Sequence, residues 1–331
     1  MKFTFSRRQL LTTACVAALS LATPTAFAQA TTDYPQSAVS MVVGWAAGGP
    51  ADTVARLVAA EMSKHLGQSV VVENKGGAGG NIGSVAAARA KPDGYTIMLA
   101  TVASHGLNAA LYDNIGYDPI KDFAPVGLIS TSPSTMLVPI DSPFKTVQDY
   151  IDQARAKPGE LTYASGGIGS SQHLAGASFK TRTGVDILHV PFKGTAPALT
   201  DVMAGRIDMI ITTGALSPIG SGKVRPLAVT SRQRIAALPD VPTFHEAGVK
   251  DFYMESWYGL VAPAGTPRPV LEKLNQALAK SLQNPELQKK FIDGGSVPAE
   301  PMSLDAYWNM VQQGMTEAQE LVRISGAKAE K

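Results

Sequence analysis

The sequence is short of cysteine. Its single cysteine, Cys15, lies within the first 28 residues, which have the three parts of a secretory signal peptide. These parts are a basic start with Lys2, Arg7 and Arg8, an apolar stretch over 10–21 and the cleavage site Ala26-Phe27-Ala28. The apolar stretch is shorter than the roughly 20 residues of a membrane span, and the paired arginines also fit a twin-arginine export signal. Cleavage leaves no thiol, which excludes disulfide bonds and a cysteine nucleophile.

Charge is sparse as well, at 17% of the residues, whereas 45% are hydrophobic. Removing the signal peptide lowers the count of Lys and Arg from 29 to 26, against 27 Asp and Glu, so the net charge changes from +2 to −1. A nearly neutral body argues against nucleic acid or a membrane surface as a partner. The remaining chain of about 300 residues has the length of roughly two domains.

The standard enzyme motifs are missing too. The dinucleotide fingerprint fails because its third glycine falls on Ile82 in one glycine tract and on Gln172 in another. Ser165 has Tyr163 two positions earlier, where a nucleophile elbow needs glycine. The five histidines are scattered, and none has the spacing of metal ligands. We therefore predict no catalytic residue, no cofactor and no metal site.

One local pattern occurs twice in the sequence. A short β-branched run leads into a turn of small residues, and an amphipathic helix follows. The first copy joins Val39–Val43 to Gly44–Asp52, and the second joins Leu161–Ala164 to Ser165–His173. Such a turn points free backbone N–H groups beyond the strand's carboxyl end, where the helix dipole also favours an anion. Two copies, neither with an arginine or lysine in its turn, predict two lobes that close on one negatively charged molecule.

Strands and helices alternate along the chain, which predicts an α/β fold with doubly wound parallel sheets. The expected strands are 39–43, 70–73, 95–100, 135–138, 161–164, 187–190, 209–211 and 227–229. The expected helices are 52–66, 84–89, 146–156, 172–183, one opened by Pro197 and ended by Gly205, 270–283 and 304–327. Asp52 is placed to cap the first helix and Gly67 to end it, and Thr146 with Asp149 fits a capping pair.

The last two helices have no strand of their own to cover, so we expect them to pack on the first lobe. The chain then crosses between the lobes twice, near Ser130 and near Ser256. This predicts a first lobe of 29–131 and 256–331 and a second lobe of 132–255.

Seven motifs, in order along the chain, resemble those of one family. They are Ala47–Asp52, Val71–Gly83, Lys91–Thr96, Gln172–Gly176, His189–Gly194, Leu238–Thr243 and Ser256–Leu260. Together they resemble the Bug family of extracytoplasmic solute receptors, the binding component of tripartite tricarboxylate transporters. The likeness covers essentially the whole chain after the signal peptide. The ordered set carries the resemblance, because no single motif is specific.

The resemblance implies a periplasmic binding protein of the type II-like, two-lobed plan, with a hinge of two crossing strands. It implies closure over a small organic carboxylate, held by backbone amides, hydroxyls and waters rather than by an arginine. It also implies delivery of the ligand, by a monomer, to the permease subunits in the membrane. Two departures lie near the expected cleft: Trp45 stands where the family more often has phenylalanine, and the segment 214–220 is a few residues shorter than usual.

Ligand contacts are expected from both turns and from residues that follow other strands. In the first turn the candidates are Trp45, Ala47, Gly48, Gly49 and Asp52, and in the second they are Gly166, Gly167, Gly169, Ser170, Ser171 and His173. Elsewhere they are Asn81, Ser104, His105, Lys193, Thr213 and Gly214. Structural roles are the alternative for several of these, namely tight turns for the glycines, helix caps for Asp52 and the two serines, and a solvated surface position for Lys193. Trp45, Trp257 and Tyr258 fit either a stack on an aromatic ligand or the core.

Two other functions stay open on the sequence alone. A secreted α/β hydrolase would use Ser165 or Ser170 as its nucleophile, although the sequence identifies no paired base. A carboxylate sensor would bind the same ligand but signal to a membrane kinase instead of a permease. The solute receptor is the function that we predict.

Overall fold

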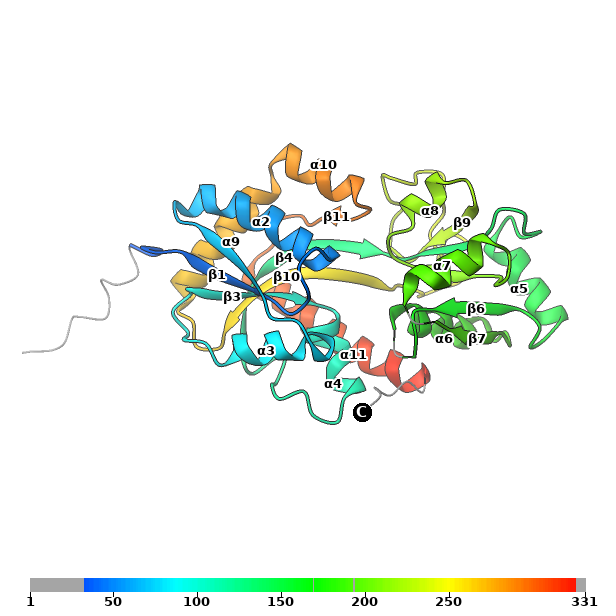
Figure 1. Cartoon of the computed structure of the whole chain (residues 1–331), viewed down its shortest axis with the longest axis horizontal. Coiled ribbons are helices and arrows are strands. Elements are labelled where there is room, and N and C mark those ends of the chain that lie inside the picture. Colours follow the sequence, from blue (N-terminus) through cyan, green and yellow to red (C-terminus); the bar gives the residue numbers. More distant parts are fainter. Residues whose placement is uncertain (1–32, 169, 193, 326–331) are drawn as a thin grey trace, which may run out of the picture.

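Two lobes of strands covered by helices lie side by side and are joined by two long strands (Figure 1). The computed structural model describes residues 33–168, 170–192 and 194–325. The predicted signal peptide, Gly169, Lys193 and the predicted helix end at Ala327 lie outside the described residues. The arrangement of one six-stranded sheet in the first lobe and two smaller sheets in the second confirms the predicted two-lobed α/β architecture. No helix of the described part is long and apolar enough to cross a membrane.

The first sheet has six strands in the order β11-β4-β10-β3-β1-β2. Their bounds are β1 Val39–Val43, β2 Val70–Asn74, β3 Thr96–Thr101, β4 Phe123–Pro133, β10 Glu255–Pro263 and β11 Val297–Pro298. β1 pairs in parallel with β2 and β3, as predicted. β10 runs antiparallel to both β3 and β4, because it brings the chain back from the second lobe.

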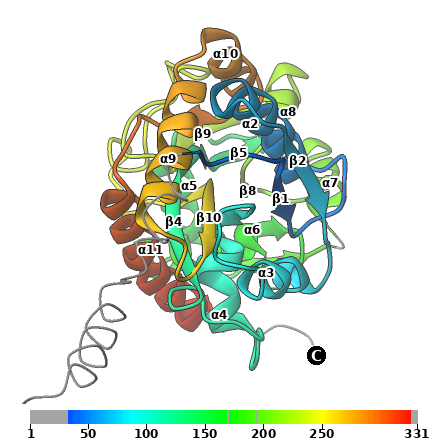
Figure 2. The ribbon, with the colours of Figure 1, turned by 90° about the vertical axis from the view of Figure 1, so that its left-hand side faces the viewer.

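Helices cover both faces of the first sheet, because its central strands carry apolar side chains on both sides. Met41 and Leu99 pack in one cluster with α2 and α9, whereas Val42 and Met98 pack in another with α3 and α11. Figure 2 shows these two helix pairs on opposite sides of the strands. The helical elements around this sheet are α2 Pro50–Leu66, η2 Ala78–Gly80, α3 Asn81–Ala88, η3 Ala103–Leu107, α4 Asn108–Leu111, α9 Arg268–Leu282, α10 Pro285–Asp293 and α11 Leu304–Ser325.

The second lobe contains a three-stranded sheet in the order β8-β5-β9 and a parallel pair, β6 and β7. An isolated parallel bridge between Tyr163 and Met209 places β6 beside the start of β8. The strands are β5 Thr135–Pro139, β6 Thr162–Ser165, β7 Leu188–Pro191, β8 Ile210–Thr212 and β9 Val224–Val229, and the helices are α5 Val147–Ala156, α6 Ser171–Thr183, α7 Thr195–Met203 and α8 Leu216–Gly220. The prediction of an all-parallel sheet is wrong here, because β5 is antiparallel to both its neighbours. β5 continues β4 into the lobe and so enters from the opposite direction to the other strands.

β4 and β10 form the connection between the lobes. They pair antiparallel from Glu255 opposite Pro133 to Pro263 opposite Phe123, and Figure 1 shows them running side by side through the middle of the molecule. The predicted crossing points lie in this pair, where Tyr258 faces Ser130. The exact lobe limits at 131/132 and 255/256 stay a prediction.

The last helix spans both lobes instead of packing only on the first. Its early residues Tyr307 and Val311 pack under the first sheet. Its later residues Ala318 and Val322 form a small cluster with Leu107 of η3 and Leu174 of α6. The expectation for this helix is therefore half right, since its second half contacts a helix of the other lobe.

Several local signals are confirmed, and some boundaries shift. Gly67 ends α2 in the left-handed conformation, and Thr146 with Asp149 forms the capping box of α5. The prediction that Asp52 caps α2 is wrong, because the helix begins at Pro50 and Gly49 is the cap residue. α7 likewise begins two residues before Pro197. α10 was not predicted, although Asn284 caps it through the backbone N–H of Glu286.

The packing of β10 against α11 generates a stability prediction. A methyl group added at Gly259 would overlap the Tyr307 hydroxyl and would lie 2.7 Å from Cζ of that ring and 3.0 Å from the Gly127 carbonyl oxygen. We expect Gly259→Ala to lower the free energy of unfolding by about 1–3 kcal/mol, because a packed core resists added volume. Urea denaturation followed by circular dichroism measures this.

Gly314→Ala is the matched control, since Gly314 lies in α11 and its added methyl would have no neighbour within 4 Å. This change should raise stability by about 0.5–1 kcal/mol, through helix propensity. Equal stability of the Gly259→Ala variant and the unaltered protein would contradict the packing described.

Candidate functional site

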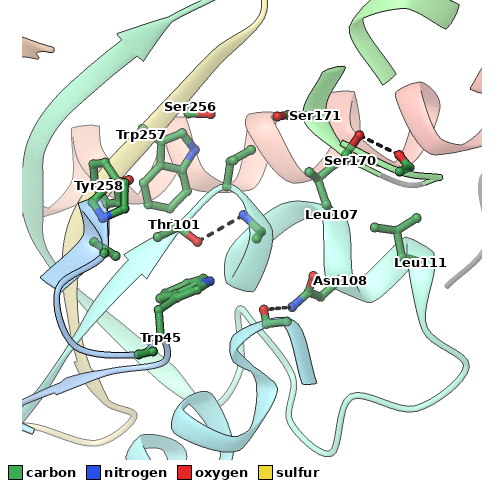
Figure 3. A pocket seen from close by; sticks show the side chains of 18 of the residues that line it. Trp45, Thr101, Leu107, Asn108, Leu111, Ser170, Ser171, Ser256, Trp257 and Tyr258 are labelled. Carbon is green, nitrogen blue, oxygen red and sulfur yellow. Dashed lines mark hydrogen bonds between the residues drawn. The ribbon is translucent and has the colours of Figure 1, made fainter. Parts of the chain in front are cut away.

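A cleft of about 1290 Å³ lies between the lobes. The carboxyl ends of β1 and β3 form its wall on the first lobe, and the turns after β6 and β7 form its wall on the second. Ser256, Trp257 and Tyr258 of the connecting strand β10 close its back. Figure 3 shows Trp45 after β1, Thr101 at the end of β3, Ser170 and Ser171 after β6, and the β10 residues around this cleft. This is the position at which open α/β sheets bind ligands.

The turn after β1 is held in place by a buried carboxylate. Asp52, only 4% exposed, accepts a hydrogen bond from the Gly48 backbone N–H at 2.9 Å and another from Arg56 Nε at 2.9 Å. Asn74 Nδ2 donates to the same carboxylate at 2.9 Å and to the Trp45 carbonyl oxygen at 3.1 Å. The bond from Arg56, together with that from Gly48, lowers the pKa of Asp52 to about 2.

The contact between Asp52 and Gly48 changes which amides are available to a ligand. The Gly48 N–H is already used by Asp52. The N–H groups of Ala47 and Gly49 donate to no group of the described residues, and both residues line the cleft. Gly48 itself has φ +83°, which favours glycine at this point of the turn. Asp52 therefore acts on the site by fixing the turn and is not part of the cleft wall.

The glycine tract 76–83 supports this turn from behind. A methyl group at Gly83 would lie 2.7 Å from the Gly44 Cα, and one at Gly80 would lie 3.0 Å from Cζ2 of Trp45. Glycine is needed at both places because the backbone and the indole approach so closely. Asn81 is buried and accepts a hydrogen bond from Asn108 Nδ2 at 2.7 Å, so that Asn108, and not Asn81, lines the cleft.

The second turn is held by serine hydroxyls. The Gly167 N–H donates to Ser165 Oγ at 3.1 Å, and Ser170 Oγ donates to the Gly167 carbonyl oxygen at 2.6 Å. Ser170 also caps α6 by accepting from the His173 N–H at 3.3 Å. Ser171 is the first residue of the helix, and both serines line the cleft.

A column of aromatic rings lies beneath the second turn. His189 stacks on His173 with 4.2 Å between ring centroids and on Tyr163 with 4.9 Å, and its Nε2 lies 2.6 Å from Ser165 Oγ. Burial, with the neighbouring His173, lowers the pKa of His189 to about 4. Burial also lowers the pKa of His173. Both imidazoles are consequently neutral at pH 7, and they add no positive charge to the site.

Ser104 and His105 follow β3 but point into the protein. They are 0% and 1% exposed. Ser104 Oγ accepts from the Thr101 N–H at 3.0 Å and lies 2.9 Å from His105 Nδ1, while the His105 ring packs edge-on against Phe123. The π-helical turn η3 causes this inward direction. Their predicted contact with a ligand has no support from this placement, and Thr101 lines the cleft instead.

The structure brings together about half of the predicted site residues. Those lining the cleft are Trp45, Ala47, Gly48, Gly49, Gly167, Ser170 and Ser171. Those outside its lining are Asp52, Asn81, Ser104, His105, Gly166, His173, Thr213 and Gly214, while Gly169 and Lys193 lie outside the described residues. The lining residues that the sequence did not predict include Thr101, Asn108, Tyr112, Ile168 and Phe192. The strand-end rule could have found Thr101 and Phe192, but no local signal marks Asn108.

The electrostatics of the cleft come from the backbone. Among the described residues, no Asp, Glu, Lys, Arg or His lines it. Its polar side chains include Thr101, Asn108, Ser170, Ser171 and Ser256. The first turns of α2 and α6 face it from the two lobes, so two helix N-termini and their free N–H groups provide the positive potential. No group of three or more His, Cys, Asp or Glu side chains in the described part could hold a metal ion.

Comparison with known proteins agrees with this geometry. A family model described as the tripartite tricarboxylate transporter family receptor matches residues 54–326. A protein of Agrobacterium vitis, named for the ttuE-ttuC' intergenic region, is 44% identical over 84% of this chain and 82% of its own length. The solved periplasmic binding protein BugD is 38% identical with a TM-score of 0.71, over 90% of this chain and 100% of that one.

Two similar structures contain ligands. Rpa4515 of Rhodopseudomonas palustris, solved with adipate, is 36% identical with a TM-score of 0.75, covering 89% of this chain and 99% of that one. MatC of the same organism, solved with malate, is 34% identical with a TM-score of 0.71, covering 87% and 100%.

Two lobes around a ligand-sized cleft, with similarity to a solved periplasmic binding protein, define a solute-binding protein of the periplasmic type. The chain belongs to the receptor family of tripartite tricarboxylate transporters, whose members include the Bug proteins. The resemblance found in the sequence is thereby confirmed.

The buried carboxylate of Asp52 generates a prediction about pH. Its pKa is about 2 in the folded protein against an ordinary 3.8, so its contribution to stability is complete above about pH 4 and is lost as the pH falls toward 2. Asp52→Asn removes a charged acceptor and should cost about 1–3 kcal/mol at pH 7. The difference from the unaltered protein should shrink at pH 3, as measured by urea denaturation at both pH values.

Asp305→Asn is the control, because the Asp305 side chain is 72% exposed and contacts only Arg268. It should change stability little at either pH. An Asp52→Asn variant as stable as the unaltered protein at pH 7 would show that this carboxylate does not hold the turn.

Proposed function

We propose that the protein captures a small organic carboxylate in the cleft between its lobes and delivers it to the membrane permease of its transporter. The carboxylate is held by backbone N–H groups of the turn at Ala47–Gly49 and of the first turn of α6, with help from the serine and threonine hydroxyls. The supporting observation is a cleft with two helix N-termini and no acidic side chain in its described wall. The relatives solved with adipate and malate support the same class of ligand.

Magnitudes explain why both lobes are needed. A carboxylate at one helix N-terminus gains about 0.3–1 kcal/mol when exposed and up to about 2 kcal/mol when partly buried. Micromolar binding requires about 8 kcal/mol. One turn is therefore insufficient, and closure of the second lobe adds the second helix end, further hydrogen bonds and the exclusion of water. The hinge that this motion needs is the β4–β10 pair, with lobes of 29–131 plus 256–331 and 132–255.

Location and partners follow from the same function. The proposal places the mature protein in the periplasm after removal of residues 1–28, as a monomer that meets the permease subunits when closed. A sensor that passes its signal to a membrane kinase would use the same cleft. The receptor is favoured because the family model is that of a transporter receptor.

We propose further that the protein is not an enzyme, although the fold pairs a serine with a histidine. Ser165 Oγ and His189 Nε2 are 2.6 Å apart, an arrangement that the sequence did not reveal. Ser165 is 0% exposed and lies outside the cleft lining, so a substrate carbonyl has no access to its hydroxyl. The pair fixes the second turn, since the same hydroxyl accepts from the Gly167 N–H.

Ser165→Ala separates these two roles. We expect the variant to bind its carboxylate about tenfold more weakly, because Gly167 loses its anchor. Hydrolysis of a simple ester such as p-nitrophenyl acetate should equal the background rate in both proteins. Ester turnover above background that disappears in the variant would support the hydrolase instead.

Ser171→Asp tests the proposed anion site directly. The dipole of α6 stabilises a carboxylate added in its first turn, but this carboxylate repels an anionic ligand. A carboxylate ligand is first identified by thermal-shift screening of an acid library against the unaltered protein. We expect the variant to have unchanged or higher thermal stability, and its affinity for that carboxylate to fall by at least about tenfold.

Ser171→Asn is the matched control, because asparagine has nearly the same size as aspartate but no charge. This variant should keep most of the affinity for the carboxylate. If the aspartate variant bound as tightly as the asparagine variant, the end of α6 could not be the anion site.

A further inference from the structure

We propose that the preferred ligand is an aromatic carboxylate whose ring stacks on Trp45. This inference rests on the proposed function and narrows its ligand class. Two observations support it: the aromatic composition of the cleft wall and the fixed position of Trp45.

The wall of the cleft is aromatic from several directions. The five aromatic residues of its described lining come from four short segments of the chain, after β1, after α4, after β7 and within β10: Trp45, Tyr112, Phe192, Trp257 and Tyr258. Val102, Leu107, Leu111 and Ile168 add aliphatic surface between them. Such a wall suits a ligand with a flat, apolar body.

The indole of Trp45 lies close against Gly80. Atoms Cζ2, Cη2 and Cε2 of its six-membered ring lie 3.0, 3.2 and 3.4 Å from the position that a Cβ of Gly80 would occupy. Its backbone is fixed by Asn74, which donates to the Trp45 carbonyl oxygen. The residue is nevertheless only half-buried and lines the cleft. Trp45 is therefore a fixed aromatic side chain in the cleft wall, on which a ligand ring can stack.

A second indole lies near the first in the wall of the cleft. Figure 3 shows Trp257 and Tyr258 above Trp45, with Thr101 between them. Trp257 is held from behind by Tyr307, whose ring meets it edge-on at 6.2 Å between centroids. Trp257 is only 8% exposed and packs in the core cluster with Tyr307, so Trp45 is the indole on which a ring can stack with little loss of side-chain entropy.

The absence of charged side chains from the described lining disfavours the alternative, a polyanionic aliphatic acid. Each further carboxylate of such an acid must lose its hydration, and here only amides and neutral polar groups replace that hydration. A flexible aliphatic chain also loses rotational freedom on binding, whereas an aromatic ring has little to lose. In a ligand with one carboxylate on a planar ring, the carboxylate would bind at the two helix N-termini and the ring would contact the aromatic wall.

A matched pair of ligands tests the proposal. Benzoate and cyclohexanecarboxylate have the same carboxylate and nearly the same size, but only benzoate has a flat π-system. Isothermal titration calorimetry with the full mature chain should give benzoate an affinity about fivefold above that of cyclohexanecarboxylate. Adipate and malate, titrated in parallel, should bind more weakly than benzoate.

Trp45→Leu keeps apolar bulk but removes the ring. The preference for benzoate over cyclohexanecarboxylate should fall to nearly one in this variant, while Trp45→Phe should keep most of it. Trp308→Phe, on α11 and outside the cleft lining, is the control and should leave the preference unchanged.

The outcomes separate this inference from the proposed function. If adipate or malate binds and benzoate does not, or if Trp45→Leu keeps the full preference, the aromatic ligand class is wrong and the carboxylate receptor stands. If none of the four acids binds, the aromatic ligand class is contradicted, whereas the carboxylate receptor is contradicted only if no acid of the screened library binds.

Discussion

The site depends on one type of hydrogen bond, in which a side-chain oxygen accepts from a single glycine N–H and so fixes the turn around that glycine. In the first lobe this oxygen belongs to the buried Asp52, which binds the Gly48 N–H. In the second lobe it belongs to Ser165, which binds the Gly167 N–H. In the first turn the neighbouring N–H groups of Ala47 and Gly49 donate to no group of the described residues, and both residues line the cleft. A receptor without a cationic side chain in its described wall needs such fixed amides, because mobile dipoles would have to be ordered by the ligand at a cost in affinity.

The connection between the lobes also contributes residues to the cleft. β4 and β10 carry the chain across, and their residues Ser256, Trp257 and Tyr258 also line the cleft. α11 spans the junction below, where Ala318 and Val322 pack with Leu107 and Leu174. Leu107 belongs both to this cluster and to the cleft wall, so a ligand that contacts it also contacts the packing on which relative motion of the lobes depends.

The sequence predicted the two strand–turn–helix units and the alternation that folds into two lobes, because glycine, serine and proline act locally on the backbone. It did not predict the direction of β5, since strand direction follows from how β4 enters the lobe and not from the residues of β5. Ser104 and His105 were expected to face the ligand from the end of β3, but the π-helical turn η3 directs them inward. The partners of Asp52 and Ser165 include Asn74 and His189, which lie 22 and 24 positions away along the chain. Contacts at that separation leave no periodic or spacing signal.

The central claim is that backbone amides from both lobes, and no cationic side chain, hold the ligand's carboxylate. A crystal structure of the mature protein with a bound carboxylate tests it most directly. The account predicts closed lobes, with carboxylate oxygens within hydrogen-bond distance of N–H groups in the Ala47–Gly49 turn and in the first turn of α6. A carboxylate paired with an arginine or lysine, or contacted by one lobe only, would contradict it.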